Sequence, residues 1–258
     1  MKALILFTIV LSLAGCANGP RIDTSHTSLG QDSRAQFIVL HYTSSDLQRS
    51  LEILKGDGVS SHYLIDESPA TIYRLVDEDR RAWHAGESQW DGRTWLNSSS
   101  IGIELVNRGY IEDERGRLWY PYSEEQIDAL IVLLKDIMQR HGLKPGAIVG
   151  HSDIAPQRKV DPGPLFPWKR LADAGLMAWP DAGAVARQRS LFARELPDVA
   201  WFQTQLVRQG YKVPEHGHLD LETRNVIAAF QMKYRPTRFD GEPDAETAAL
   251  LAVLAAER

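Results

Sequence analysis

This chain of 258 residues has a single cysteine, few long apolar runs and no excess of positive charge. Its one cysteine, Cys16, excludes an intramolecular disulfide and a cysteine-rich zinc site. The apolar stretch at 3–13 is shorter than the roughly 20 residues that a membrane-spanning helix needs. Lys and Arg number 29 against 34 Asp and Glu, a net charge of −5. This balance disfavours binding to a phosphate backbone, and we expect no nucleic-acid partner.

The overall composition is that of a globular protein. Hydrophobic residues make up 43% and charged residues 24%, which excludes a disordered or collagen-like chain. A domain takes roughly 100–200 residues, so the length predicts two domains, or a large one with a small companion. No glycine-rich phosphate loop of the G-x-x-x-x-G-K-[ST] kind occurs.

The N-terminus has the features of a secretory signal at residues 1–15: a basic start, a short apolar region and small residues before Cys16. The sequence LAGC at 13–16 resembles a bacterial lipobox, which implies cleavage before Cys16 and lipidation of its thiol. Because Ala17 rather than Asp follows, the resemblance implies sorting to the outer membrane, with the protein anchored on its periplasmic face. The alternative is a simple secretory signal with an incidental cysteine. Residues 16–35 are polar and aperiodic, which predicts a linker.

Apolar and β-branched runs after this linker predict strands at 37–42, 62–65, 71–76, 101–106 and 147–149. Between the last two, apolar residues recur at helical spacing from a Ser123–Gln126 capping-box pattern to Gly142. A proline-rich loop is expected at 150–167 and a short helix at 168–174. Strands and helices mix, so we predict an α/β (α+β) fold with a mixed central sheet covered by helices.

A second, helical unit begins near residue 186. A helix is expected at 198–209, ended by Gly210. Residues 217–223 and 241–247 then echo each other, with Asp220 and Asp244 as candidate N-caps before two apolar helices. Three short helices in about 70 residues predict a small bundle.

Two histidines and an aspartate follow predicted strands and could share a metal. His41 lies at a strand end, His151 just past another, and Asp161 ten residues later. Two imidazoles and one carboxylate with an open fourth position suit a catalytic zinc. The spacing alone leaves other interpretations of these residues open. A histidine could have a structural role, Asp161 could be a turn residue before proline, or Asp153 could be the third ligand.

The motifs around these residues resemble the zinc-dependent N-acetylmuramoyl-L-alanine amidases of the AmpD/AmiD type (amidase type 2 family), and most of all their outer-membrane lipoprotein members. Six blocks carry the resemblance in order: VLHYT (39–43), VSSHYLI (59–65), RAWHAG (81–86), SIGIEL (100–105), GHSDIAP (150–156) and RKVDPGP (158–164). The resemblance implies a catalytic domain at 36–185. It is looser at 190–258, where it implies a peptidoglycan-binding-like helical domain.

This resemblance also implies a ligand set and two catalytic residues. The Zn²⁺ ligands are His41, His151 and Asp161. Asp153 is less suited than Asp161, because a ligand only two residues from His151 needs a tight local chelate. Glu104 is implied as the general base, since a glutamate in an apolar strand is costly to bury without a role; a solvent-facing glutamate is the alternative. Lys159 is implied as the cation beside the oxyanion, with a surface lysine as the alternative.

Substrate contacts are expected from four residues: His84, Trp83, Asn107 and Arg108. His84 could equally support a metal ligand, and Trp83 could be an ordinary packing residue. The resemblance implies hydrolysis of the amide between N-acetylmuramic acid, anhydro forms included, and L-alanine of the stem peptide in cell-wall turnover or recycling. Its partners would be peptidoglycan and muropeptides, and we expect a monomer. The competing functions are a non-catalytic peptidoglycan recognition module and a zinc endopeptidase.

Overall fold

The computed structural model describes residues 19–114 and 116–256. The predicted signal at 1–15 and Cys16 lie outside this range. The chain divides into two compact units after residue 32. In the first unit, residues 19–32 form no helix or strand. No helix of the described chain is long and apolar enough to cross a bilayer.

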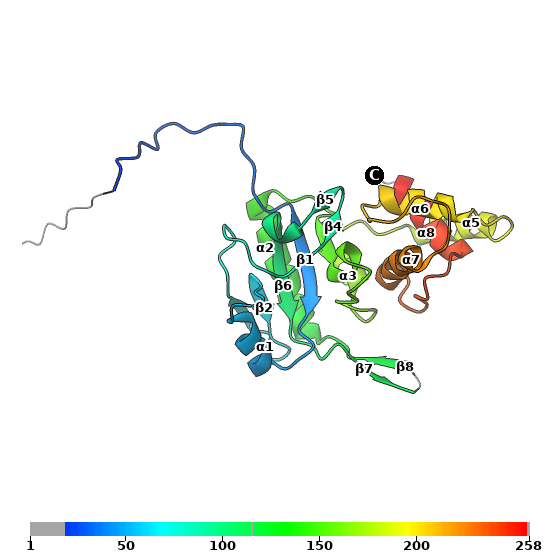
Figure 1. The fold of residues 1–258 in the computed structure, drawn as a ribbon, viewed down its shortest axis with the longest axis horizontal. Coiled ribbons are helices and arrows are strands. Elements are labelled where there is room, and N and C mark those ends of the chain that lie inside the picture. The colour runs from blue at the N-terminus through cyan, green and yellow to red at the C-terminus, as the bar shows by residue number, and fades with distance from the viewer. Residues whose placement is uncertain (1–18, 115, 257–258) are drawn as a thin grey trace, which may run out of the picture. The chain divides into compact units, whose positions relative to one another are not determined.

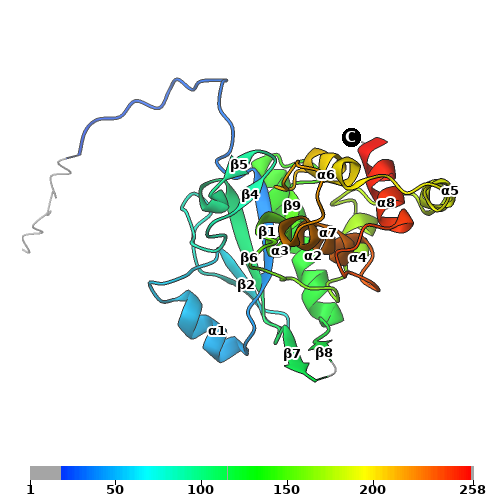
Figure 2. The same cartoon turned by 45° about the vertical axis from the view of Figure 1, so that its right-hand side comes forward.

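A five-stranded sheet lies at the centre of the second unit, in the order β3-β2-β6-β1-β9 (Figures 1 and 2). Four neighbouring strands are parallel and only β3 is antiparallel, so the predicted mixed sheet is confirmed. Its strands fall in the predicted runs, shortened or moved by one or two residues in most of them: β1 (Phe37–Tyr42), β2 (Tyr63–Ile65), β3 (Ile72–Arg74), β6 (Ser100–Leu105) and β9 (Ile148–Gly150).

The other elements are two strand pairs and the helices. The pairs are β4 (Gln89–Trp90) with β5 (Arg93–Thr94), and β7 (Tyr110–Asp113) with β8 (Gly116–Trp119). The helices are α1 (Leu47–Leu54), η1 (Leu96–Ser98), α2 (Glu124–His141), α3 (His151–Ile154), α4 (Trp168–Asp173), α5 (Ala182–Phe192), α6 (Val199–Arg208), α7 (Leu221–Tyr234) and α8 (Ala245–Ala256).

The predicted helix α2 forms between the expected caps. The Ser123 hydroxyl accepts the backbone N–H of Gln126, and Gly142 ends the helix with φ 64°, a left-handed conformation that suits glycine. Gln126 does not complete a capping box. Its side chain is buried and donates to the carbonyls of Ile65 and Val106, both at 3.0 Å, so it joins α2 to the sheet instead.

The two faces of β1 enter different cores because successive side chains point to opposite sides of a strand. Ile38 and Leu40 pack in the core that contains α2. Phe37 and Val39 pack in a core shared with α6, α7 and α8, where Phe230 is fully buried. The helical C-terminal part therefore buries apolar surface against the sheet, which is a large favourable contribution to folding.

The sequence echo in the C-terminal part reflects a repeated contact. Gln203 receives the backbone N–H of Gly217 and donates to Thr223 Oγ1 at 3.0 Å. Gln231 makes the same two contacts with the counterparts Gly241 and Thr247. The predicted caps Asp220 and Asp244 are both present.

Two expectations about the chain after β9 need correction. The loop predicted at 150–167 contains α3, whose four residues are all buried, so packing rather than periodicity stabilises it. The helix α5 was not expected, because none of its residues is buried and its sequence shows no apolar stripe. It spans the predicted boundary between 185 and 190. The three predicted helices of the C-terminal part are confirmed as α6, α7 and α8, and α5 precedes them.

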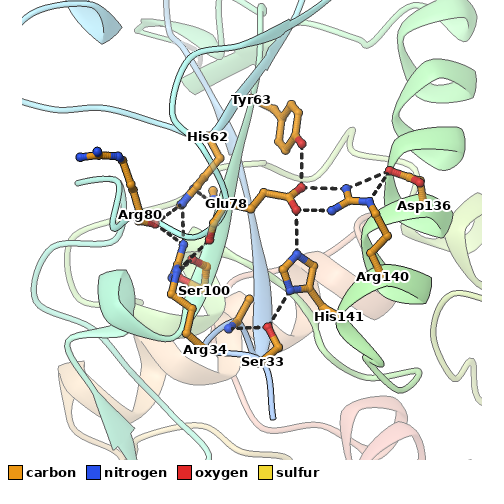
Figure 3. Close-up of polar contacts among 12 residues, drawn as sticks. Ser33, Arg34, His62, Tyr63, Glu78, Arg80, Ser100, Asp136, Arg140 and His141 are labelled. Atoms are coloured by element: carbon orange, nitrogen blue, oxygen red, sulfur yellow. Dashed lines mark hydrogen bonds and ion pairs between the residues drawn. The ribbon is translucent and has the colours of Figure 1, made fainter. Parts of the chain in front are cut away.

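A polar cluster around Glu78 joins the β3 side of the sheet to the end of α2 (Figure 3). Its carboxylate accepts hydrogen bonds from Tyr63 at 2.6 Å, from Arg140 at 2.8 Å and from His141 at 2.7 Å. Burial alone would raise the pKa of Glu78, but the hydrogen bonds from Arg140, Tyr63 and His141 outweigh it and lower that pKa to about 2. On its other nitrogen, His141 contacts Ser33, the first residue of the second unit.

Candidate metal centre

Three ligand atoms converge at the carboxyl end of the sheet. His41 Nδ1 lies 2.9 Å from His151 Nδ1 and 3.1 Å from Asp161 Oδ2, and His151 Nδ1 lies 3.0 Å from the same oxygen. All three side chains are buried. Within residues 19–114 and 116–256, this is the one group of histidine, cysteine and acidic side chains able to hold a metal ion. The donor set, two imidazoles and a carboxylate, fits a zinc ion.

The sheet topology explains why residues so distant in sequence meet. His41 is near the end of β1, and His151 directly follows β9, the parallel neighbour of β1. The carboxyl ends of parallel strands lie at one edge, where ligands commonly bind. Asp161 is brought to this edge by its loop, because the Ser152 backbone N–H donates to the Asp161 carbonyl at 2.8 Å.

Asp153, the rival third ligand, points away from this site. Its Oδ2 accepts from the Gly150 backbone N–H and from Lys233, both at 2.8 Å, and its Oδ1 accepts from Tyr211 at 2.7 Å. Both carboxylate oxygens are thus bound to protein donors. Asp153 caps α3 and contacts α7 of the C-terminal part through Lys233.

The protonation states of the converging groups suit metal binding. Burial, reinforced by the charge of His151, lowers the pKa of His41 to about 4, so His41 is neutral at pH 7. Burial acts to raise the pKa of Asp161, but His151 and His41 hold it well below its ordinary value. Metal ligation needs neutral imidazole and ionised carboxylate, and both are present here.

Glu104 is the neighbour of His41 across the β1–β6 pair. Its Oε2 is buried and has no hydrogen-bond partner within the described residues. Burial first, and then the charge of Asp161, raise the pKa of Glu104 to about 8, while Lys159 acts in the opposite direction. A carboxyl group with a pKa near neutrality in a cleft is able to accept and return a proton.

A pocket of about 230 Å³ exposes this site to solvent. Lys159, Glu104 and the three converging side chains line it, together with Trp83, which is 47% exposed. The pocket thus combines a possible metal site, a titratable carboxyl group, an ammonium group and an aromatic face. Such a set can polarise a carbonyl, move a proton and stabilise a developing negative charge, as the hydrolysis of an amide requires.

The other expected substrate-binding residues lie differently. His84 lines the pocket, but its two ring nitrogens contact His41 and Ser100. Asn107 donates to the Tyr120 and Pro121 carbonyls and accepts from the Gly109 backbone N–H, so its amide holds a loop rather than a substrate. Arg108 lines a separate pocket beside α1.

Two residues beside the ligands were missed as site residues. Ser100 received no role in the sequence because its contact with His84 depends on the folded chain. Gly102 also received no role, but a Cβ there would lie 2.4 Å from the Cγ of His84. The signal available in the sequence was this glycine inside an apolar strand, which often marks a close approach by another group.

Comparison with known proteins agrees with this site. A family profile described as "N-acetylmuramoyl-L-alanine amidase" matches residues 31–164, and one described as "Putative peptidoglycan binding domain" matches 195–251. The amidase AmiD of Escherichia coli (strain K12) is 44% identical over 96% of this chain and 95% of its own length.

Solved structures agree over nearly the whole chain. The structure of E. coli AmiD with anhydro-N-acetylmuramic acid-L-Ala-D-gamma-Glu-L-Lys has a TM-score of 0.85, covering 93% of this chain and 95% of that one. AmpDH3 of Pseudomonas aeruginosa in complex with anhydromuramic pentapeptide also has a TM-score of 0.85, at 40% identity, covering 92% of this chain and 98% of that one. The three converging side chains lie inside the region matched by the amidase profile, and the chain belongs to the N-acetylmuramoyl-L-alanine amidase family.

Proposed function

We propose that this protein is a zinc-dependent amidase that cleaves the bond between N-acetylmuramic acid, anhydro forms included, and L-alanine of peptidoglycan stem peptides. The observation that carries the proposal is the buried convergence of His41, His151 and Asp161 beside the unpartnered oxygen of Glu104. The family match and the muropeptides named for the related structures support the substrate class. Such an activity would serve cell-wall turnover or recycling.

The three converging side chains would hold the zinc ion. When bound, zinc supplies Lewis acidity, polarising a carbonyl and making water acidic near neutral pH. Glu104 accepts a proton from the water that attacks the amide carbonyl carbon. It then donates that proton to the amine nitrogen as the carbon–nitrogen bond breaks, a role typically worth about 10²–10⁴-fold in rate. The Lys159 ammonium stabilises the negative charge that develops on the carbonyl oxygen.

We further propose that the helical region at 190–258 binds peptidoglycan, supported by the second family match. Cys16 is proposed as the lipidated residue of an outer-membrane lipoprotein, on the basis of the sequence at 13–16. Mass spectrometry of the protein extracted from membranes tests this: the mature N-terminus should be an acylated Cys16. Release of Cys16→Ala into the soluble fraction should accompany the loss of acylation.

Incubation of the purified protein with an anhydro-muropeptide, followed by mass spectrometry, tests the activity. We expect free stem peptide and intact sugar. Cleavage within the peptide would support a zinc endopeptidase instead, and unchanged substrate at saturating zinc would support a recognition module. The presence of Glu104 and Lys159 in the metal pocket favours the enzyme over the module.

A further inference from the structure

We propose that His84 and Ser100 are positioning residues that hold His41 in the tautomer whose Nδ1 is free to bind the metal. This inference rests on the proposed zinc-dependent function. A hydrogen-bond chain carries it, from the Leu96 carbonyl through Ser100 and His84 to His41. Groups that orient a ligand histidine through its second nitrogen strengthen metal binding at many protein sites.

The donor and acceptor of each hydrogen bond in this series can be assigned by starting from the Leu96 carbonyl. Ser100 Oγ lies 2.6 Å from the Leu96 carbonyl oxygen, which can only accept, so the single hydroxyl proton of Ser100 is used there. Ser100 Oγ must then accept from His84 Nε2, which lies 3.2 Å away. A neutral His84 protonated on Nε2 has an unprotonated Nδ1.

His41 completes the chain. Its Nε2 lies 3.0 Å from His84 Nδ1 and must donate, which leaves the lone pair of His41 Nδ1 directed toward His151 and Asp161. A metal ligand must be a neutral imidazole, which carries a single N–H, so a His41 that donates through Nε2 has no proton on Nδ1. The chain of bonds therefore specifies one tautomer.

A backbone hydrogen bond and a close approach to β6 hold His84 in place. Its backbone N–H donates to Asn97 Oδ1 at 3.0 Å, and its ring occupies the space left by Gly102. The next residue, Ala85, offers its carbonyl oxygen at 3.3 Å to Nε2 of His151. The segment at 84–85 thus contacts the Nε2 atoms of both candidate ligand histidines, and both present Nδ1 to the site.

His62 provides a contrast within the same region. Its ring lies edge-on to that of His84, with centroids 5.7 Å apart. Its Nδ1 accepts from the Gly102 backbone N–H at 2.9 Å, and its Nε2 lies 3.1 Å from the Arg80 carbonyl oxygen and 2.9 Å from the Arg34 guanidinium. None of these partners is a candidate metal ligand, so His62 does not extend the series of hydrogen bonds to the site.

The test measures zinc affinity of the full chain by competition with a chromophoric chelator. His84→Leu removes the acceptor for His41 and should weaken zinc binding about 10–100-fold. Ser100→Ala should weaken it by up to about tenfold, because His84 can then adopt either tautomer. The matched control is Ser61→Ala. Ser61 is fully buried and its hydroxyl has no hydrogen-bond partner in the described structure. The zinc affinity of Ser61→Ala should therefore stay within about twofold of wild type.

A second readout separates positioning from mere packing. Long-range ¹H–¹⁵N NMR of the metal-free protein should show His41 protonated on Nε2, and a mixture of tautomers in Ser100→Ala and His84→Leu. His84→Asn, which can place an amide oxygen near the former Nδ1, should recover part of the zinc affinity lost in His84→Leu. If His84→Leu misfolds, Ser100→Ala alone decides.

Wild-type zinc affinity in folded Ser100→Ala or His84→Leu, with an unchanged His41 tautomer, would overturn the inference. Failure of the proposed function gives a different result: a wild-type protein that binds no zinc or releases no stem peptide. The tautomer of His41 in the metal-free chain is measurable in either case.

Discussion

Lys233 Nζ lies 2.8 Å from Oδ2 of Asp153, and both side chains are almost completely buried. Lys233 belongs to α7 in the C-terminal part, and Asp153 to α3, the short helix that begins with His151. Tyr211 donates to the other oxygen of the same carboxylate. The C-terminal part is therefore joined to the metal-site helix by a buried ion pair as well as by a shared apolar core.

Lys233→Met should destabilise the protein by about 3–5 kcal/mol, because it leaves the buried Asp153 carboxylate without its cation. Urea denaturation measures the loss. The catalytic and helical parts should unfold in a single transition, since they share a core. Asp153→Asn combined with Lys233→Met should recover part of the stability.

The matched control is Lys169→Met, which removes an exposed ion pair with Asp173 on α4. Exposed pairs contribute about 0–1 kcal/mol, so this variant should unfold close to wild type. Equal effects of the two lysine substitutions, or two separate unfolding transitions in the wild type, would contradict the account.

Glu104→Gln should lower kcat about 10²–10⁴-fold while zinc content stays unchanged, because the amide cannot carry the proton between water and the leaving amine. Steady-state release of stem peptide measures kcat, and elemental analysis measures zinc. A variant that retains zinc and hydrolyses at the wild-type rate would remove Glu104 from the mechanism.

Trp83→Ala should raise KM for the muropeptide about 2–10-fold with little change in kcat, since an exposed aromatic face in the pocket binds substrate and transition state alike. The control is Trp95→Ala. Trp95 is 63% exposed but lines a different pocket, beside Arg158, and its loss should leave KM unaltered. Equal KM changes in both variants would contradict a specific role for Trp83.

Glu78→Gln should lower the free energy of unfolding at pH 7 by about 1–3 kcal/mol, because hydrogen bonds to a charged acceptor are lost. The folded-state pKa of Glu78 is about 2 and its ordinary value is 4.5. The stabilisation by the charged form is thus complete above pH 4.5 and is lost as the pH falls toward 2. The stability difference between wild type and Glu78→Gln should narrow across that interval. A difference that stays constant from pH 6 to pH 3 would exclude the depressed pKa.

Much of the sheet and of α2 could be predicted because local signals specify them. Residues 37–40 of β1 are apolar throughout, as in a strand that is buried on both faces, and Ser123 and Gly142 mark the two ends of α2. The helix α5 and the hairpin β7–β8 could not be predicted in this way. Their residues are largely exposed, so no periodic apolar pattern distinguishes them.

The converging ligands could be anticipated from family-like motifs, but their surroundings could not. The contact between His84 and His41 depends on how the loop at 84–85 crosses the sheet. The amide of Asn107 was expected to meet substrate, yet it satisfies backbone groups of its own loop. Such contacts depend on strand register and loop path, which a single sequence does not encode locally.

The most direct test of the central claim measures bound zinc and stem-peptide release together in His41→Ala, His151→Ala and Asp161→Ala. His218→Ala, a substitution of an exposed histidine in the C-terminal part, is the control. The account predicts about one zinc per wild-type and control chain, with loss of both zinc and turnover in each of the three ligand variants. Wild-type turnover in any ligand variant, or in wild-type protein stripped of zinc by a chelator, would contradict it.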